Sequence, residues 1–252
     1  LEVFGLQPEK AGRGMEEILQ LASIARDYNI PFSIVPHAAY SISLPLFRLL
    51  RKHTENNIIT SFHFMETEAE RSFLKYYDGP LKESFHESDL LPAHPELVSD
   101  HVSAVLDEIT PSGSLILVHN TFVDRNTIRK LRSRENLYWC LCPRANLHIE
   151  NRVPPLDLLT AEDCRIVIGT DSLASNKSLD ILEELKVLQA YYPEIPLQDL
   201  VKWATFNGAM ALRQENNYGN ISSGKKPGLL LLQDVDLQNM KLLPESRVKR
   251  LA

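Results

Sequence analysis

Apolar and polar residues along this chain follow two alternating patterns. Short runs that are almost entirely apolar, and rich in β-branched, aromatic or leucine residues, are typical of strands buried on both faces. The stretches between them repeat apolar residues at helical spacing, as Ile18, Ala22 and Ala25 do within the segment 15–29. This alternation predicts an α/β fold with a parallel sheet and right-handed crossovers.

The expected strands cover residues 1–6, 32–36, 58–62, 115–118, 137–141 and 165–169. The expected helices cover 15–29, 44–56, 95–109, 124–133, 178–192 and, as two short pieces, 199–212, with Ser43 and Ser178 as candidate N-caps. These elements form about six βα units, fewer than the eight of a complete barrel. We therefore expect residues 1–215 to form a partial TIM-like (β/α)8 barrel without its first units. Residues 216–252 are expected to form part of a small β-sandwich appendage.

Several apolar runs end in a residue that can bind a metal or transfer a proton. His37, His63, His119 and Asp171 each follow such a run. Because an α/β barrel builds its active site from the carboxyl ends of its strands, these side chains are expected to converge. Glu66 lies three residues after His63, so a turn directly after His63 would bring both to the same site.

Each of these residues alone also has a structural interpretation. A strand-end histidine can be a core residue bonded to the backbone, Asp171 can cap a helix or a turn, and Glu66 can be a solvated residue at a helix start. The repeated placement at strand ends favours a shared site. The remaining histidines occur in polar stretches or helices and are expected at the surface: His53, His86, His94, His101 and His148.

Composition limits the other possibilities. The net charge is −6 and the basic residues are scattered, which argues against a nucleic-acid or anionic membrane partner. No run of about 18 apolar residues and no signal-peptide pattern occurs in the sequence, so we expect a soluble, cytoplasmic protein. Cys140, Cys142 and Cys164 contain no C-x-x-C pair, and we expect them to be core residues in a reducing compartment.

Longer segments of the chain match known motifs in order. The motifs are VPHAAYSIS, HFMETEAE, LVHNTFVD, CPRANLHI, GTDSLASNKSLDILEE, ATFNGAMAL and GNISSGKKPGLLLL, and the match runs from about residue 1 to 235. Together they resemble the amidohydrolase superfamily, and most closely its chlorohydrolase and aminohydrolase branch, which contains S-adenosylhomocysteine and guanine deaminases. The resemblance implies that the expected strands are strands 3 to 8 of that family's barrel.

The resemblance also implies roles for individual residues. His63 and Asp171 would bind one catalytic Zn²⁺ or Fe²⁺, and Glu66 would be the proton shuttle. His119 would hydrogen-bond the attacking water or the developing tetrahedral centre. His37 and Ser175 would face a small-molecule substrate with an aminated ring. The implied reaction is hydrolytic deamination, or a related C–N or C–halogen hydrolysis, and related enzymes are often homodimers.

The chain departs from the family in its metal ligands. The family's first strand carries an H-x-H segment with two ligands, and no H-x-H occurs in this sequence. Two ligands do not fix a catalytic zinc, which usually has three protein ligands. We expect the missing units to lie upstream of Leu1 in the parent protein, and the metal to be absent from this chain alone; a metal-poor derivative is the alternative. Asn120 and Phe122 replace a cysteine and a histidine often found beside the sixth-strand histidine, which leaves the substrate open.

Two other functions remain open at this point. The same fold could serve as a non-catalytic binding or scaffold protein, and metal content would separate that from an enzyme. A hydrolase of the same superfamily could instead remove a halide or an alkylamine, and the identity of the released product would separate that from a deaminase.

Overall fold

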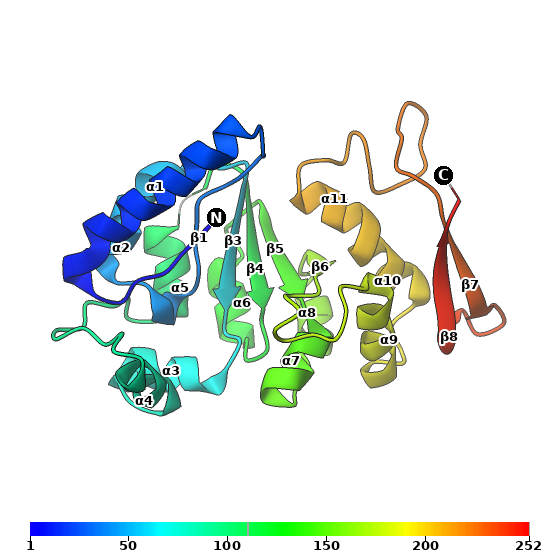
Figure 1. Cartoon of the computed structure of the whole chain (residues 1–252). Helices are drawn as coiled ribbons and strands as arrows, with labels where there is room; N and C mark the ends of the chain where they lie inside the picture. Colours follow the sequence, from blue (N-terminus) through cyan, green and yellow to red (C-terminus); the bar gives the residue numbers. More distant parts are fainter. Residues whose placement is uncertain (110, 252) are drawn as a thin grey trace. The chain divides into compact units, whose positions relative to one another are not determined.

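The computed structural model describes residues 1–109 and 111–251. The chain forms two compact units, Leu1–Leu137 and Tyr138–Ala252. In both units helices alternate with parallel strand pairs (Figure 1). The expected α/β class is therefore confirmed.

The first unit contains short strands and the helices that follow them. Its elements are β1 (Glu2–Val3), η1 (Pro8–Lys10), α1 (Ala11–Asp27), β2 (Val35–Pro36), η2 (Ala39–Ser41), α2 (Leu44–Thr54), β3 (Ile59–Phe64), α3 (Glu68–Tyr76), α4 (Pro80–Glu87), α5 (His101–Ser103), η3 (Ala104–Glu108), β4 (Ser114–His119) and α6 (Arg125–Leu131). Of these, η1 and η2 are 3₁₀ turns and η3 is a π-helical segment.

The strands of the first unit run parallel in the order β1, β2, β3, β4. Glu2 pairs with Val35, a single bridge joins Ala38 to His63, and His63 pairs with Val118. In β3 the residues Phe62 and Phe64 are fully buried, so one face of this strand lies in the core. Because all four strands point the same way, their carboxyl ends lie at one edge.

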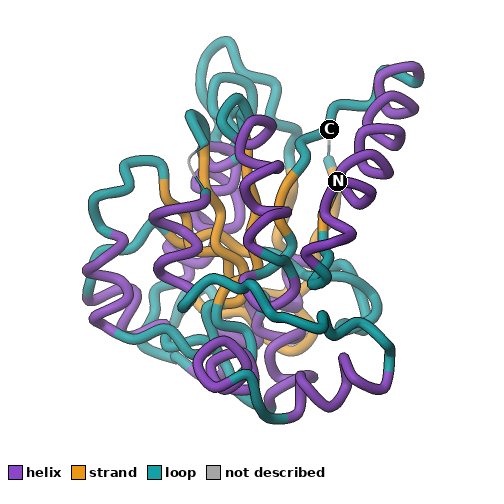
Figure 2. The backbone as a smooth tube through the Cα atoms, turned by 90° about the vertical axis from the view of Figure 1, so that its left-hand side faces the viewer, coloured by secondary structure: helices purple, strands orange, loops and turns teal. Residues whose placement is uncertain are grey.

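Helices α1 and α2 cover part of this sheet. The buried residues of α1 follow one another at intervals of three or four: Ala11, Met15, Ile18, Ala22 and Ala25. This spacing places them on one helix face, which packs against α2 and β1. Figure 2 shows helices running alongside the strands. Hydrophobic burial along the helix, rather than capping, holds it in place, since the N-cap Lys10 makes no side-chain cap bond.

The second unit combines a parallel pair, helices and a hairpin. Its elements are β5 (Leu137–Leu141), which begins at the boundary, α7 (Pro143–Glu150), α8 (Leu156–Ala161), β6 (Ile166–Ile168), α9 (Ile181–Tyr191), α10 (Leu197–Lys202), η4 (Trp203–Asn207), α11 (Gly208–Ala211), β7 (Leu230–Asp236) and β8 (Lys241–Arg250). Strands β5 and β6 are parallel, and β7 and β8 form an antiparallel hairpin. The Gln189 side chain bonds both the N–H (2.8 Å) and the carbonyl (2.7 Å) of Leu242, which ties the hairpin to α9.

Most expected strands occur where the sequence placed them, but several helices differ. The expected helix 95–109 is wrong over its first half: α5 starts only at His101, capped by the Asp100 carboxylate, which accepts from Ser103 N–H at 2.9 Å. Helix α9 starts at Ile181 and is capped by Asp180, not by Ser178. Residues 197–211 are helical throughout, with the π-helical η4 in the middle. Helices α3, α4, α7 and α8 were not expected.

The cysteines largely follow the expectation. Cys140, in β5, and Cys142, directly after it, are both buried, and a Cβ at Gly169 would meet both sulfurs, at 2.9 Å and 3.2 Å. Cys164 is only partly buried. A larger residue at 169 would therefore displace both thiols.

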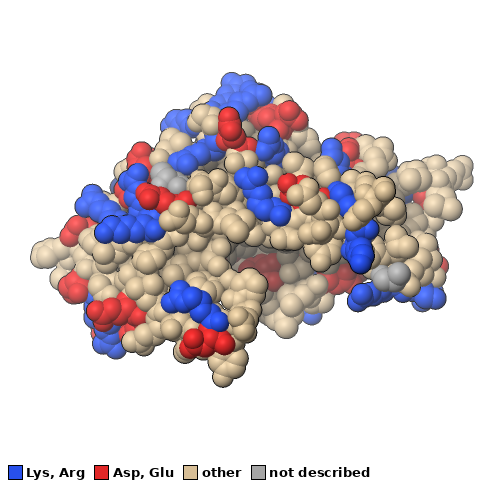
Figure 3. Space-filling view, turned by 90° about the horizontal axis from the view of Figure 1, so that it is seen from above, with Lys and Arg blue, Asp and Glu red and all other residues tan. Residues whose placement is uncertain are grey.

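The surface carries mixed charge. Lys and Arg side chains lie interspersed with Asp and Glu over the face seen in Figure 3. Within the described residues, none of the helices combines the length and the apolar character needed to cross a membrane.

Candidate active site

Three of the expected histidines lie together at the carboxyl ends of the strands of the first unit. His37 directly follows β2, His63 is the penultimate residue of β3, and His119 is the last residue of β4. The ring centroids of His37 and His63 are 4.6 Å apart, and those of His63 and His119 are 5.3 Å apart. The parallel register produces this row of imidazoles, since neighbouring strands end side by side.

The chain turns just after β3, as the sequence suggested. Met65 adopts a left-handed conformation with φ of 50°, and Glu66 follows. Two hydrogen bonds from the segment after β4 hold this turn: Asn120 N–H donates to Phe64 O and Phe122 N–H donates to Met65 O, both at 3.0 Å.

Strand β4 also ends in an unusual backbone conformation. His119 and Asn120 are consecutive left-handed residues, with φ of 78° and 59°. Left-handed residues other than glycine are uncommon, and strained backbone tends to cluster at functional sites. The Asn120 amide stabilises the bend by donating to Leu117 O at 2.8 Å.

This bend and the turn after β3 bring Glu66 to His119. The distance from Glu66 Oε1 to His119 Nε2 is 3.3 Å, and the two side chains are only 12% and 1% exposed. A carboxylate and an imidazole at this distance, largely shielded from water, can exchange a proton directly or through a water molecule.

Hydrogen bonds orient the other two imidazoles. Ser41 Oγ donates to Ala38 O at 3.2 Å and lies 2.8 Å from His37 Nδ1, so Nδ1 of His37 is the donor in that bond. His63 Nδ1 lies 3.0 Å from the carbonyl of His37 and must donate to it. Both rings therefore carry their lone pair on Nε2, the form in which histidine binds a metal or accepts a proton.

These donors suit a divalent transition metal. Glu2, His37 and His63 each offer one ligand atom, and these atoms all lie within 4.8 Å of one another. Imidazole and carboxylate are ordinary ligands of Zn²⁺, and the backbone carbonyl that fixes the His63 tautomer is a frequent outer partner of zinc-bound histidine.

Asp171 and Ser175 lie in the second unit, in the loop after β6. Ser175 Oγ donates to the Asp171 carboxylate, and Asp171 is left-handed with φ of 56°. Asn176 Nδ2 ties the loop to α9, donating to Thr170 O and to Glu184 Oε1, both at 2.7 Å. Burial raises the pKa of Glu184, and the hydrogen bonds from Arg144 N–H and Asn176 oppose this. The metal-binding role of Asp171 and the substrate-binding role of Ser175 stay predictions.

The structure adds neighbours of the site that the sequence interpretation missed: Glu2, Tyr40, Ser41, Glu70 and His101. Tyr40 and Ser41 follow His37 within the motif HAAYS, and Glu70 follows Thr67 at the spacing of a capping box. These two local patterns were available signals.

The surface position expected for His101 is wrong. It is only 6% exposed, and its Nε2 lies 2.7 Å from Glu70 Oε2. Because residues three and four apart share a helix face, His101 lies on the same face as the buried Ala104 and Val105. Helical spacing thus carried the signal, although the flanking residues are polar. His86, His94 and His148 are exposed and His53 is partly exposed.

Tyr40 gives a pH-dependent prediction. Burial raises its pKa above the usual tyrosine value, and the nearby carboxylates of Glu70 and Glu66 raise it further. Above about pH 10 the unfolded chain loses this proton while the folded one keeps it, so stability should fall as pH rises. Tyr40→Phe should therefore lose less stability than wild type between pH 9 and 11 in urea titrations. Equal losses in both proteins would contradict this environment for Tyr40.

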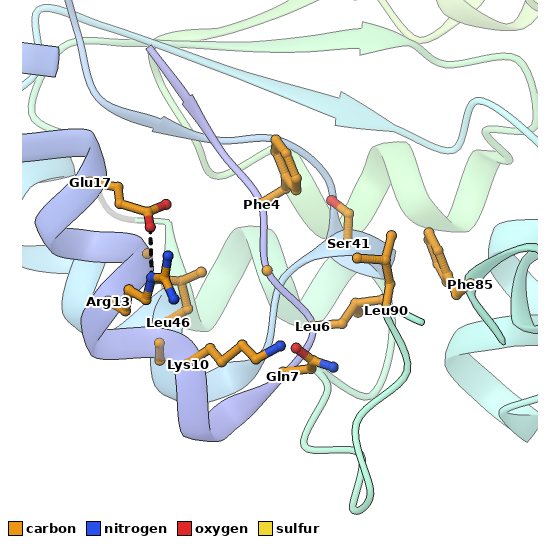
Figure 4. A pocket seen from close by; sticks show the side chains of 13 residues that line it. Phe4, Leu6, Gln7, Lys10, Arg13, Glu17, Ser41, Leu46, Phe85 and Leu90 are labelled. Carbon is orange, nitrogen blue, oxygen red and sulfur yellow. Dashed lines mark hydrogen bonds and ion pairs between the residues drawn. The ribbon is translucent and has the colours of Figure 1, made fainter. Parts of the chain in front are cut away.

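A pocket of about 410 Å³ lies in the first unit. Its walls are mainly apolar, from Phe4, Leu6, Leu46, Phe85 and Leu90, and Gln7, Lys10 and Arg13 add polar groups (Figure 4). Arg13 is paired with Glu17, with Nε 2.8 Å from Oε1.

One residue joins this pocket to the histidines. Ser41 lines the pocket and also bonds His37. A ligand in the pocket would therefore lie one hydrogen-bonded residue away from the row of imidazoles.

Comparison with known proteins places this geometry in context. A 5-methylthioadenosine/S-adenosylhomocysteine deaminase of Thermococcus kodakarensis is 28% identical over 229 residues, which cover 86% of this chain and 49% of the relative. The chain thus spans about half the length of the curated relatives it matches.

Solved structures show the same fold. Helicobacter pylori aminofutalosine deaminase in complex with methylthio-coformycin superposes with a TM-score of 0.71 at 23% identity, covering 90% of this chain and 56% of that one. Atrazine chlorohydrolase from Arthrobacter aurescens, complexed with zinc, superposes with a TM-score of 0.60 at 17% identity, covering 89% and 50%.

The match to a family model spans both units. The model of the amidohydrolase family covers residues 9–248, from η1 into β8, the last strand of the hairpin. This agrees with the motifs found at the strand ends and with the fold of the solved relatives. The chain belongs to the amidohydrolase family.

Proposed function

We propose that the protein carrying this chain is a metal-dependent hydrolase that deaminates an aminated heterocycle. The observation that supports this most directly is the buried contact between Glu66 and His119 next to the metal-capable His63. A carboxylate for proton transfer, an imidazole and a metal ligand within one small region are what hydrolytic attack on a ring carbon needs.

The metal in this proposal is Zn²⁺, with Fe²⁺ as the alternative. His63, through Nε2, and Asp171 would hold it, and a third protein donor would complete the usual ligand set of a catalytic zinc. When bound, the cation would supply a hydroxide nucleophile near neutral pH, since it can lower the pKa of water to about 7. The fixed tautomer of His63 supports this assignment, because the carbonyl of His37 already occupies its Nδ1–H.

The chain's own residues would manage the protons and the substrate. Glu66 would take a proton from the attacking water and deliver it to the ring nitrogen or the leaving amine. His119 would hydrogen-bond the oxygen that attacks, and it is held within reach of Glu66. His37 would accept a hydrogen bond from the ring through Nε2, and Ser175 would contact the substrate from the loop after β6.

The pocket lined by Ser41, the hydrogen-bond partner of His37, would take the part of the substrate that does not react. Phe4 is 68% exposed and lines this pocket, so its ring is available to a ligand. Phe4→Ala should raise KM about tenfold with kcat nearly unchanged. The reason is that the lost contact stabilises the bound substrate and the transition state by the same amount. Tyr28→Ala is the control, since Tyr28 is also an exposed aromatic residue of the first unit but does not line the pocket. Equal KM values in the two variants would argue against this use of the pocket.

Product analysis of the complete, zinc-loaded protein tests the reaction. Aminated purine nucleosides, including 5′-methylthioadenosine, would be incubated with it, and ammonia would be measured by a coupled assay. A chlorinated and an N-alkylated triazine would be run in parallel. Ammonia release supports the proposal, and release of chloride or alkylamine alone would favour a dehalogenase or N-dealkylase. Ligand binding without turnover by a metal-free preparation would favour a binding protein.

A further inference from the structure

A buried carboxylate–imidazole pair lies behind the turn that carries Glu66, and the function proposed above does not use it. Glu70, in the first turn of α3, has no exposed surface, and His101, the first residue of α5, is nearly buried. Glu70 Oε2 lies 2.7 Å from His101 Nε2. The other oxygen, Oε1, accepts from Thr67 N–H at 2.8 Å.

Both oxygens of this carboxylate therefore have a donor. An isolated buried carboxylate is costly, and removing one partner of such a pair leaves the other charge uncompensated. His101 Nε2 is placed to donate to the second oxygen of Glu70, and Glu70 in turn accepts from the backbone N–H of Thr67, the residue directly after Glu66. His101 is therefore linked through Glu70 to Thr67, which directly follows Glu66, the proposed proton shuttle.

His101 also contacts the other side of the same turn. Its ring lies edge-on to the Phe64 ring, with centroids 5.7 Å apart and planes at 76°. Phe64 is fully buried and ends β3 directly before the turn. The His101 side chain therefore holds both ends of the turn. It packs on the ring of Phe64 before the turn, and through Glu70 it holds Thr67 after it. Met65 and Glu66 are the two residues enclosed between these contacts.

Capping of α3 alone does not require this arrangement. A carboxylate at the third helical position satisfies the N-cap N–H with one oxygen. Here the second oxygen is bonded to a histidine 31 residues further along the chain, from another helix. We propose that His101 and Glu70 are positioning residues that hold Glu66 at proton-transfer distance from His119. This inference rests on the function proposed above.

The first test compares two variants of His101 in the complete, metal-loaded protein. His101→Leu removes the donor, and kcat should fall roughly 10- to 100-fold, because a displacement of about 1 Å can cost as much as 100-fold in rate. KM should change less than about twofold. His101→Gln keeps an N–H donor of similar reach and should retain kcat within about threefold. Should His101→Leu fail to fold, His101→Asn replaces it, since its amide is too short to reach Glu70.

The second test separates positioning from general loss of stability. If His101 acts through Glu66, then His101→Leu should have little further effect on kcat in a Glu66→Gln background. Ile18→Ala, a buried truncation in α1, is the control for stability, and it should lower Tm without lowering kcat. Amide hydrogen exchange at Thr67 gives a readout that needs no activity: His101→Leu should reduce its protection, and His101→Gln should not.

The outcomes distinguish this inference from the proposed function. An active wild-type protein in which His101→Leu keeps wild-type kcat would refute the positioning role and leave the function intact. If His101→Leu lowered kcat by the same factor in the Glu66→Gln background, His101 would have a structural role only. That result would also refute the positioning role. A wild-type protein without hydrolase activity would refute the proposed function itself, and with it any role for His101 in turnover.

Discussion

Glu66→Gln should lower kcat by about 10²- to 10⁴-fold in the complete protein, which is the range that a positioned general acid or base contributes. Glutamine has the same shape and can still hydrogen-bond His119, but it cannot take a proton from water at neutral pH. Tm and substrate binding should therefore stay close to wild type. Steady-state kinetics, together with thermal unfolding followed by circular dichroism, would measure both.

Glu68→Gln provides the matched control for this substitution. Glu68 lies two residues further along, in the first turn of α3, and its side chain is 56% exposed. Its substitution removes the same charge from the same region without touching His119, so kcat should be unchanged. A folded Glu66→Gln enzyme with near-normal kcat would remove Glu66 from the mechanism.

His63→Ala should abolish retention of zinc by the complete protein and reduce turnover to background. The side chain supplies an imidazole with its tautomer already fixed by the carbonyl of His37, so its loss removes a ligand and no other residue of the row can take its exact place. The effect should exceed the roughly 10- to 100-fold loss in affinity that follows removal of an outer hydrogen-bond partner. Metal content after dialysis, measured by plasma mass spectrometry, and competition with a zinc chelator would quantify it.

His86→Ala is the control for metal binding. His86 is an exposed histidine in α4, so this variant should keep its zinc and its turnover. If His63→Ala retained stoichiometric zinc and wild-type affinity, His63 would not be a ligand, and the metal would have to be held by other groups.

The apolar runs predicted the strands well because burial on both faces leaves a strong local signal. The sequence placed the fifth strand at the bounds that β5 shows, Leu137–Leu141, and all five of its residues are buried. Once the strands were located, the clustering of the histidines at their ends could be predicted as well, because parallel strands bring their last residues to one edge. His37, His63 and His119 are the result.

Helices with little apolar periodicity were missed. Helix α4 buries none of its residues and begins at Pro80 after the left-handed Gly79, so only its Gly-Pro start marked it. The error over 95–109 has a local cause as well, because the Asp100 carboxylate caps the helix at His101 and leaves the residues before it outside. The residue at which a helix begins is thus set by single residues, such as Pro80 and Asp100, and not by the periodic pattern of apolar positions.

Partners within the site could not be predicted, because they depend on tertiary distances. Nothing in the sequence joins Glu70 to His101, which lies on another helix and was expected at the surface. Likewise, the sequence did not indicate that the Ser175 hydroxyl donates to the Asp171 carboxylate, a contact that leaves the predicted substrate-binding role of Ser175 untested. A residue that only positions another side chain has no distinctive local sequence pattern, whereas a residue at the end of an apolar strand has one.

The bend at the end of β4 limits how this site could be copied into another protein. His119 reaches Glu66 because two successive residues leave the ordinary strand conformation. An engineer who grafted the same side chains onto a regular strand would point the imidazole elsewhere. A designed version would therefore have to reproduce the backbone first, with Asn or a comparable residue at the position after the histidine, before any choice of side chains could restore the contact.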